Sequence, residues 1–217
     1  MPALDDRQIG LPPIEQLASL IAPPLCAGCG SVRPGGEVLC ERCATELATA
    51  PRVREPGPPC VDLAISASPL DGVARLIVHG LKFGRRLSLA RVAAEAALRG
   101  LPAAESPEGV VPVPPGPWRW RWRGFDPAEE IAIAAAEIIG VPFSTCLRRG
   151  RGRRQVGRRR WQRLAEPPRV WTVAAAPREA LLVDDVWTTG ATLSACAQAL
   201  RTAGSQRIVA LTLARAL

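Results

Sequence analysis

Alternating apolar and polar positions divide most of the chain into short strands and amphipathic helices. Apolar runs typical of buried strands occupy residues 110–113, 180–183 and 208–213. Apolar residues at helical spacing occupy residues 14–21, 71–78, 88–98 and 126–138, and the same spacing resumes at Leu193, Ala197 and Leu200. Strands that alternate with helices indicate an α/β domain with a largely parallel sheet.

Start and stop signals support these boundaries. Asp126 is placed to act as an N-cap, with Pro127 at the first helical position. Gly140 follows the last apolar position of that helix and is expected to end it. Asp71 and Ser88 are expected to cap the two helices that follow them.

Composition separates an N-terminal region from the remainder. Residues 1–60 are rich in Pro, Gly and Cys, whereas residues 61–217 carry nearly all of the predicted strands and helices. We therefore expect a small accessory module followed by one ordinary domain. The first residues lack the basic start and apolar stretch of a secretory signal, and no apolar run reaches about 18 residues. The sequence thus predicts a cytoplasmic protein without membrane insertion.

Four of the seven cysteines form two pairs with metal-ligand spacing. Cys26 and Cys29 make one Cys-x-x-Cys pair, and Cys40 and Cys43 make another after ten residues. Two such turns can present four thiolates to zinc, and a four-thiolate set leaves no open coordination position. We therefore predict a structural zinc in a ribbon-like module. The alternative is unliganded thiols whose spacing is coincidental.

Residues 181–192 carry the most chemical information: Leu-Leu-Val-Asp-Asp-Val-Trp-Thr-Thr-Gly-Ala-Thr. The predicted strand delivers Asp184 and Asp185 to its carboxyl end, where open α/β sheets bind ligands. The turn at residues 188–192 then opens a helix, whose N–H groups and dipole favour an anion. One end of this segment favours a phosphate, and the acids favour hydroxyl donors or a cation. A ribose 5-phosphate offers both; the alternative is that the threonines only cap the helix.

This segment resembles the motif by which type I phosphoribosyltransferases bind phosphoribosyl pyrophosphate (PRPP). The resemblance implies that Asp184 and Asp185 orient the ribose through its hydroxyls, which is the catalytic role we assign to them. It also implies that the following loop cradles the 5-phosphate through Thr188, Thr189, Gly190, Ala191 and Thr192. Mg²⁺ would accompany the PRPP.

Further segments follow the order expected of the ComF family of competence-associated proteins. They are, in order, residues 79–84, 111–114 and 123–126, then Gln155 within the arginine-rich stretch, and finally residues 211–215. The resemblance implies a type I phosphoribosyltransferase-like sheet with a small N-terminal zinc ribbon. It implies a transferase with an unidentified acceptor and a role in DNA uptake, with single-stranded DNA or competence proteins as partners. The chain departs from the family at Asp126-Pro127, where relatives usually have Asn-Gln, and at Cys60, which stands alone.

Positive charge points to further residues that could bind the pyrophosphate of PRPP. The net charge is +8, and arginine supplies every positive side chain except Lys82. The phosphoribosyltransferase analogy places Pro114 and Arg123 in the loop that faces the pyrophosphate. It places Arg148 and Gln155 in a mobile loop that closes over PRPP. The alternative for the loop with Pro114 and Arg123 is a proline-rich surface loop. The alternatives for the loop with Arg148 and Gln155 are a solvated segment or a basic arm. Such an arm would bind single-stranded DNA in a non-catalytic protein. Lys82 is either a phosphate contact or an ordinary surface residue.

Overall fold

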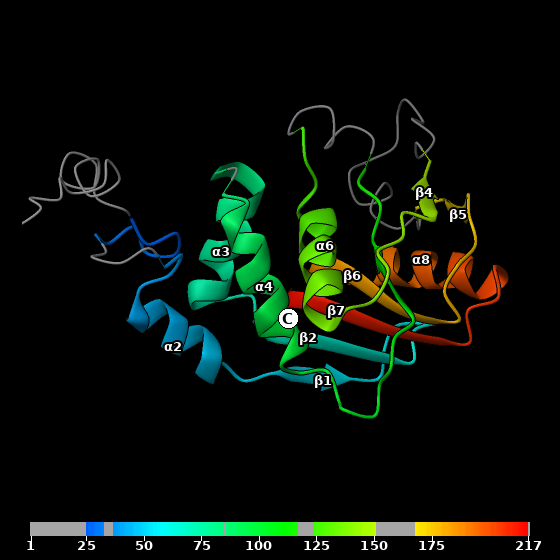
Figure 1. Cartoon of the computed structure of the whole chain (residues 1–217), viewed down its shortest axis with the longest axis horizontal. Helices are drawn as coiled ribbons and strands as arrows, with labels where there is room; N and C mark the ends of the chain where they lie inside the picture. The colour runs from blue at the N-terminus through cyan, green and yellow to red at the C-terminus, as the bar shows by residue number, and fades with distance from the viewer. Residues whose placement is uncertain (1–24, 33–36, 85, 117–123, 151–167, 217) are drawn as a thin grey trace, which may run out of the picture.

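A computed structural model describes residues 25–32, 37–84, 86–116, 124–150 and 168–216 (Figure 1). Their centre is a five-stranded sheet in the order β1-β2-β7-β6-β3. The strands are β1 (Val53–Glu55), β2 (Leu63–Pro69), β7 (Arg207–Arg215), β6 (Glu179–Trp187) and β3 (Gly109–Pro112). β1 is antiparallel to β2, and the other four strands are parallel to one another. The protein is therefore an α/β structure with a mixed sheet.

Helices cover both faces of the sheet. On one face lie α3 (Gly72–Gly84), α4 (Ser88–Leu98) and α6 (Pro127–Ile139). The other face carries α8 (Ala191–Thr202) and the hairpin of β4 (Leu147–Arg149) and β5 (Val170–Thr172). Along β6, Leu181 and Val183 join the first core, and Leu182 joins the second core. Because both faces of the strand are buried, its sequence is an unbroken apolar run instead of an alternating one.

The predicted strands and helices are present wherever the structure describes their residues. The Asp126 cap is confirmed: its Oδ1 accepts a hydrogen bond from the N–H of Ala128 at 3.0 Å. Gly140, with a φ of 70°, ends α6 in the left-handed conformation. The predicted capping role of Ser88 is wrong, because Ser88 is the first helical residue and Leu87 occupies the cap position. The predicted helix at residues 14–21 lies outside the described residues.

Several elements were not predicted from the sequence. They are α2 (Glu41–Thr49), the strands β1 and β2, and the hairpin of β4 and β5. β2 has the sequence Leu-Ala-Ile-Ser-Ala-Ser-Pro and is buried along most of its length. Its small residues do not form the apolar run that is typical of a buried strand. Among the described residues, no helix is both long and apolar enough to cross a membrane.

The cysteine-rich region packs directly onto the sheet domain. Cys26, Leu39, Cys43 and Leu47 belong to the same buried cluster as the residues of α3 and α4. In addition, Oε1 of Glu46 in α2 accepts a hydrogen bond from the N–H of Val73, at the start of α3. β1 lies before residue 60 and nevertheless pairs with β2, which lies after it. The first 60 residues thus contribute both a strand and part of the core.

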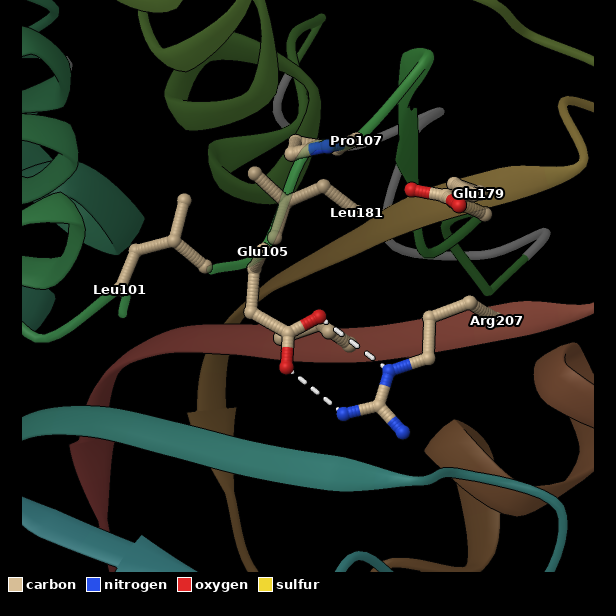
Figure 2. A pocket seen from close by; sticks show the side chains of 8 residues that line it. Leu101, Glu105, Pro107, Glu179, Leu181 and Arg207 are labelled. Carbon is tan, nitrogen blue, oxygen red and sulfur yellow. Dashed lines mark hydrogen bonds and ion pairs between the residues drawn. The ribbon is translucent and has the colours of Figure 1, made fainter. Parts of the chain in front are cut away.

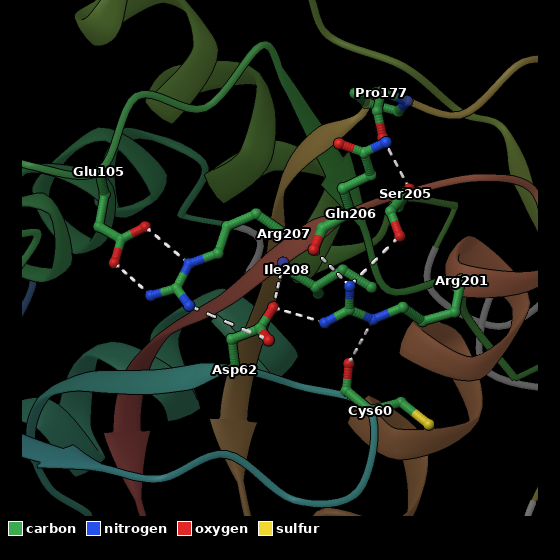
Figure 3. A network of polar contacts seen from close by, with 9 residues as sticks. All are labelled: Cys60, Asp62, Glu105, Pro177, Arg201, Ser205, Gln206, Arg207 and Ile208. Carbon is green, nitrogen blue, oxygen red and sulfur yellow. Dashed lines mark hydrogen bonds and ion pairs between the residues drawn. The ribbon is translucent and has the colours of Figure 1, made fainter.

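Charged side chains close the amino ends of the strands. Figure 3 shows Asp62 accepting hydrogen bonds from Nη2 of Arg201 at 2.6 Å and from the N–H of Ile208 at 2.7 Å. Arg207 donates to both carboxylate oxygens of Glu105, at 2.6 and 3.2 Å (Figure 2). The cavity beside this pair has a volume of only about 10 Å³, which is room for about one water molecule. This cavity therefore offers no space for a larger ligand.

Candidate functional site

A cleft of about 680 Å³ opens at the carboxyl ends of β3 and β6. After β3 the chain continues to α6 on one face of the sheet, and after β6 it continues to α8 on the other. Neighbouring parallel strands with connections to opposite faces mark the position where open α/β sheets bind ligands. The lining comes mainly from residues 70–82, 113–116, 125–128 and 184–192, together with Arg149 and Pro168.

Two adjacent carboxylates and one lysine lie together in this cleft. β6 continues past Asp184 and Asp185 to Trp187, so both acids belong to the strand and do not simply follow it. Nζ of Lys82, in the last turn of α3, lies 2.6 Å from Oδ2 of Asp185. The Asp185 N–H donates to Oδ1 of Asp184 at 2.8 Å. Lys82 thus enters the site as the partner of a predicted ribose-binding acid.

The surroundings of Asp184 favour its neutral form. Desolvation raises the pKa of Asp184 well above its ordinary value, and the negative charge of Asp185 raises it further. The hydrogen bond from the Asp185 N–H and the charge of Lys82 lower the pKa of Asp184, but they do not cancel the larger effects. A ligand that brings positive charge or hydroxyl donors to this carboxyl would favour its ionised form.

Residues 188–192, here called the threonine loop, connect β6 to α8. Thr188 and Thr189 are exposed, and Thr188, Thr189, Ala191 and Thr192 all line the cleft. Gly190 has a φ of 80°, which other residues rarely adopt. A Cβ atom at this position would also lie 2.8 Å from Cβ of Pro58. Glycine is therefore required twice here, for the turn and for the close packing behind it.

The remaining predicted site residues fall in different places. Pro114 lines the cleft, as does Lys82. Arg148 is not among the lining residues, and its Nη1 donates to the carbonyls of Thr145 and Leu147. Arg123 and Gln155 lie outside the described residues, as does most of the arginine-rich stretch.

Several other lining residues, among them Arg149, Phe125 and Asp126, had no individual site role assigned from the sequence. Arg149 lines the cleft, whereas its neighbour Arg148, the residue that was predicted, does not. In a run of arginines, the local sequence does not indicate which side chain points toward the ligand site. Phe125 and Asp126 also line the cleft. Asp126 was interpreted only as a helix cap, although a cap at the start of α6 also lies at the ligand-binding edge of the sheet.

The four predicted metal-binding cysteines lie together. The Sγ atoms of Cys26, Cys29, Cys40 and Cys43 are all within 4.8 Å of one another. The distance between the Sγ atoms of Cys29 and Cys40 is 3.7 Å. Four bonds of about 2.3 Å to one tetrahedral zinc would separate the sulfurs by about 3.8 Å. Hydrogen bonds with Ser31 lower the pKa of Cys29 to about 6 and favour its thiolate, whereas burial raises the pKa of Cys43 to about 12. The four thiols could therefore hold a metal ion.

Comparison with known proteins does not identify a family. A scan of the chain against models of protein families finds no match, and a search of curated proteins finds none. The chemistry of the cleft must therefore be inferred from its own residues.

Proposed function

We propose that the cleft binds PRPP together with Mg²⁺ and that the protein is a phosphoribosyltransferase-type enzyme. The observation that carries this proposal is the arrangement of two carboxylates and a glycine-containing threonine loop on one cleft at the switch point of the sheet. A sugar phosphate needs both kinds of group, hydroxyl acceptors for the ribose and N–H and O–H donors for the phosphate.

The threonine loop supplies the phosphate end of this proposal. α8 begins at Ala191, whose N–H donates to Oγ1 of Thr189 at 3.4 Å, so the first turn of the helix and the positive end of its dipole adjoin the threonine loop. Gly190 permits the left-handed turn between β6 and α8 and the close packing of this turn on Pro58, which together place the loop beside the cleft. A dianionic 5-phosphate suits this end better than a neutral group does.

Asp184 and Asp185 supply the ribose end. Carboxylates accept hydrogen bonds from vicinal hydroxyls, and they are also ligands that Mg²⁺ prefers. When bound, Mg²⁺ would neutralise charge on the pyrophosphate. Lys82 already neutralises Asp185, so a ligand approaching this pair meets one neutralised acid and one whose pKa is raised. The free cleft therefore carries less negative charge than its two acids suggest, which favours an anionic substrate.

In the proposed reaction, the bond between C1 of the ribose and the pyrophosphate oxygen breaks. Pyrophosphate leaves with the bonding electron pair, and an acceptor nucleophile forms the new bond to C1. The protein's contribution is to hold the ribose and the phosphate in place while positive charge develops on the sugar. Lys82 and Arg149 are the described cations that line the cleft and can face the departing negative charge.

We also propose that the metal held by the four cysteines is zinc in a structural role. The sulfur spacing fits tetrahedral zinc, and all four positions are thiolates from the protein. The site packs into the core beside α3 and lies apart from the residues that line the cleft. Its contribution would be to folding.

Calorimetric titration of the metal-loaded protein with PRPP and Mg²⁺ tests the proposed function. We expect binding at 1:1 stoichiometry and its loss in the double variant D184N/D185N. Glu95→Gln, an exposed change on α4, is the matched control and should bind as the unmodified protein does. Unchanged affinity in the double variant, or no binding by a folded protein, would refute the assignment.

A further inference from the structure

Arg215 stands at the base of the threonine loop, and the proposed function gives it no role. It is the last residue of β7 and lies opposite Trp187, the last residue of β6, in the parallel register. Its guanidinium carbon is 4.1 Å from the centre of the Trp187 ring, within range of a cation–π interaction. Arg215 thus lies where the sheet ends and the loop begins.

The guanidinium holds the main chain at this point. Its Nη1 donates to the carbonyl of Trp187 at 3.3 Å and to the carbonyl of Thr188. The same nitrogen donates to the carbonyl of Ala216 at 2.7 Å, and the Ala216 N–H returns a bond to the Trp187 carbonyl at 2.8 Å. One side chain therefore joins the first residue of the threonine loop to the ends of two strands.

Within the described part of the chain, no acid neutralises the positive charge of Arg215. Among the described residues, its hydrogen bonds go to carbonyls, and no carboxylate forms an ion pair with it. Its Nε is buried and has no hydrogen-bond partner among these residues. A cation at the loop base that has no acidic partner among the described residues gives a field that favours an anion at the loop.

We propose that Arg215 is the positioning residue of the threonine loop, fixing the loop in the conformation that receives a phosphate group. It acts through the carbonyls of Trp187 and Thr188 and does not itself need to touch the ligand. The ligand class rests on the proposed function, whereas the ordering of the loop rests only on the contacts of Arg215.

The chain offers a matched control for this inference. Arg201, near the end of α8, also donates through Nη1 to main-chain carbonyls, those of Ser205 and Gln206. It lies at the amino edge of the sheet, away from the cleft (Figure 3). Arg215→Gln and Arg201→Gln therefore both remove guanidinium hydrogen bonds to main-chain carbonyls, the first beside the start of α8 and the second near its end, and Arg201→Gln also removes the ion pair with Asp62.

Two measurements on the metal-loaded full-length protein test the inference. The first is hydrogen–deuterium exchange of the ligand-free protein. Arg215→Gln should speed exchange at residues 188–191 by about tenfold or more, since hydrogen bonds from a charged donor are being lost. Arg201→Gln should leave these residues unchanged and affect residues 205–208 instead. The second is calorimetric titration with Mg²⁺ and PRPP, in which Arg215→Gln should weaken binding by about tenfold or more and Arg201→Gln should not.

The outcomes separate this inference from the proposed function. If the unmodified protein does not bind PRPP, the proposed function fails, and the exchange measurement alone decides the role of Arg215. If PRPP binds but Arg215→Gln changes neither loop exchange nor affinity, the positioning role is refuted and the function stands. If Arg215→Gln does not fold, Arg215→Lys decides: it keeps the charge but loses the planar guanidinium. Loop exchange as slow in Arg215→Lys as in the unmodified protein would overturn the inference.

Discussion

Replacing Lys82 by methionine should destabilise the protein by about 2 kcal/mol, because it leaves Asp185 without its partner. Two unit charges about 4 Å apart attract by about 4 kcal/mol at an effective dielectric constant of 20. Lys82 and Asp185 are only 21% and 12% exposed, so solvent screens them weakly, but desolvation offsets part of the attraction. The expected loss is thus larger than the loss of less than about 1 kcal/mol for an exposed pair. It is smaller than the loss of about 3–5 kcal/mol for a buried pair that loses one partner.

A double-mutant cycle measures this interaction. The variants are K82M, D185N and their combination, and the assay is urea unfolding followed by tryptophan fluorescence, with the buried Trp187 two residues along β6 from Asp185. The coupling free energy should be about 2 kcal/mol. Arg91→Met breaks the exposed pair with Glu95 and serves as the control, with an expected loss below about 0.5 kcal/mol. A K82M loss as small as the control's, together with no coupling, would refute the structural role of this ion pair.

Three further predictions concern Asp184, Gly190 and the cysteines. The raised pKa of Asp184 means that the folded state loses stability as pH rises from about 3.8 toward the folded pKa. In urea unfolding, Asp184→Asn should therefore be more stable than the unmodified protein at pH 7, and this gain should shrink toward pH 4. A variant that is less stable than the unmodified protein at pH 7 would contradict this reasoning. Gly190→Ala should destabilise the protein by more than the roughly 1–2 kcal/mol of left-handed strain, because its Cβ also meets Pro58. Gly204→Ala, at a φ of 101° with open space around it, measures the strain alone. Equal thermal stabilities of the two variants would argue against the close packing at Gly190. Removing the metal with a chelator should speed hydrogen exchange in residues 37–50 and in the first turn of α3, whereas unchanged exchange there would show that the thiols hold no structural metal.

The sequence predicted those parts of the fold that depend on local signals. Asp126, Pro127 and Gly140 mark both ends of α6 because capping and left-handed geometry depend on only a few neighbouring residues. The apolar run at residues 180–183 identified β6 because a strand buried on both faces has no polar positions. β2 was missed because its small residues carry little strand preference, and its pairing with β7 is what makes it a strand.

The candidate site was predictable only in part for the same reason. Asp184 to Thr192 are consecutive, so their spacing could be interpreted directly. The ion pair of Lys82 with Asp185 joins α3 to β6, and the contacts of Arg215 join β7 to the threonine loop. Such pairs depend on the register of the sheet and the position of a helix, which local sequence patterns do not encode. Arg149 likewise lines the cleft because of where the hairpin packs.

α3 connects two chemistries that the sequence presents as separate. In its first turn the Val73 N–H donates a hydrogen bond to Glu46, near the cysteines, and its last turn carries Lys82 into the cleft. A helix of 13 residues is a stiff rod about 20 Å long, so a shift at one end is transmitted to the other. A genetic screen for loss of ligand binding should consequently recover changes at Glu46 and in the cysteine region as well as in the cleft. The metal-binding segment would then be inherited as part of the binding site, and exchanging it between related proteins would require exchanging α3 with it.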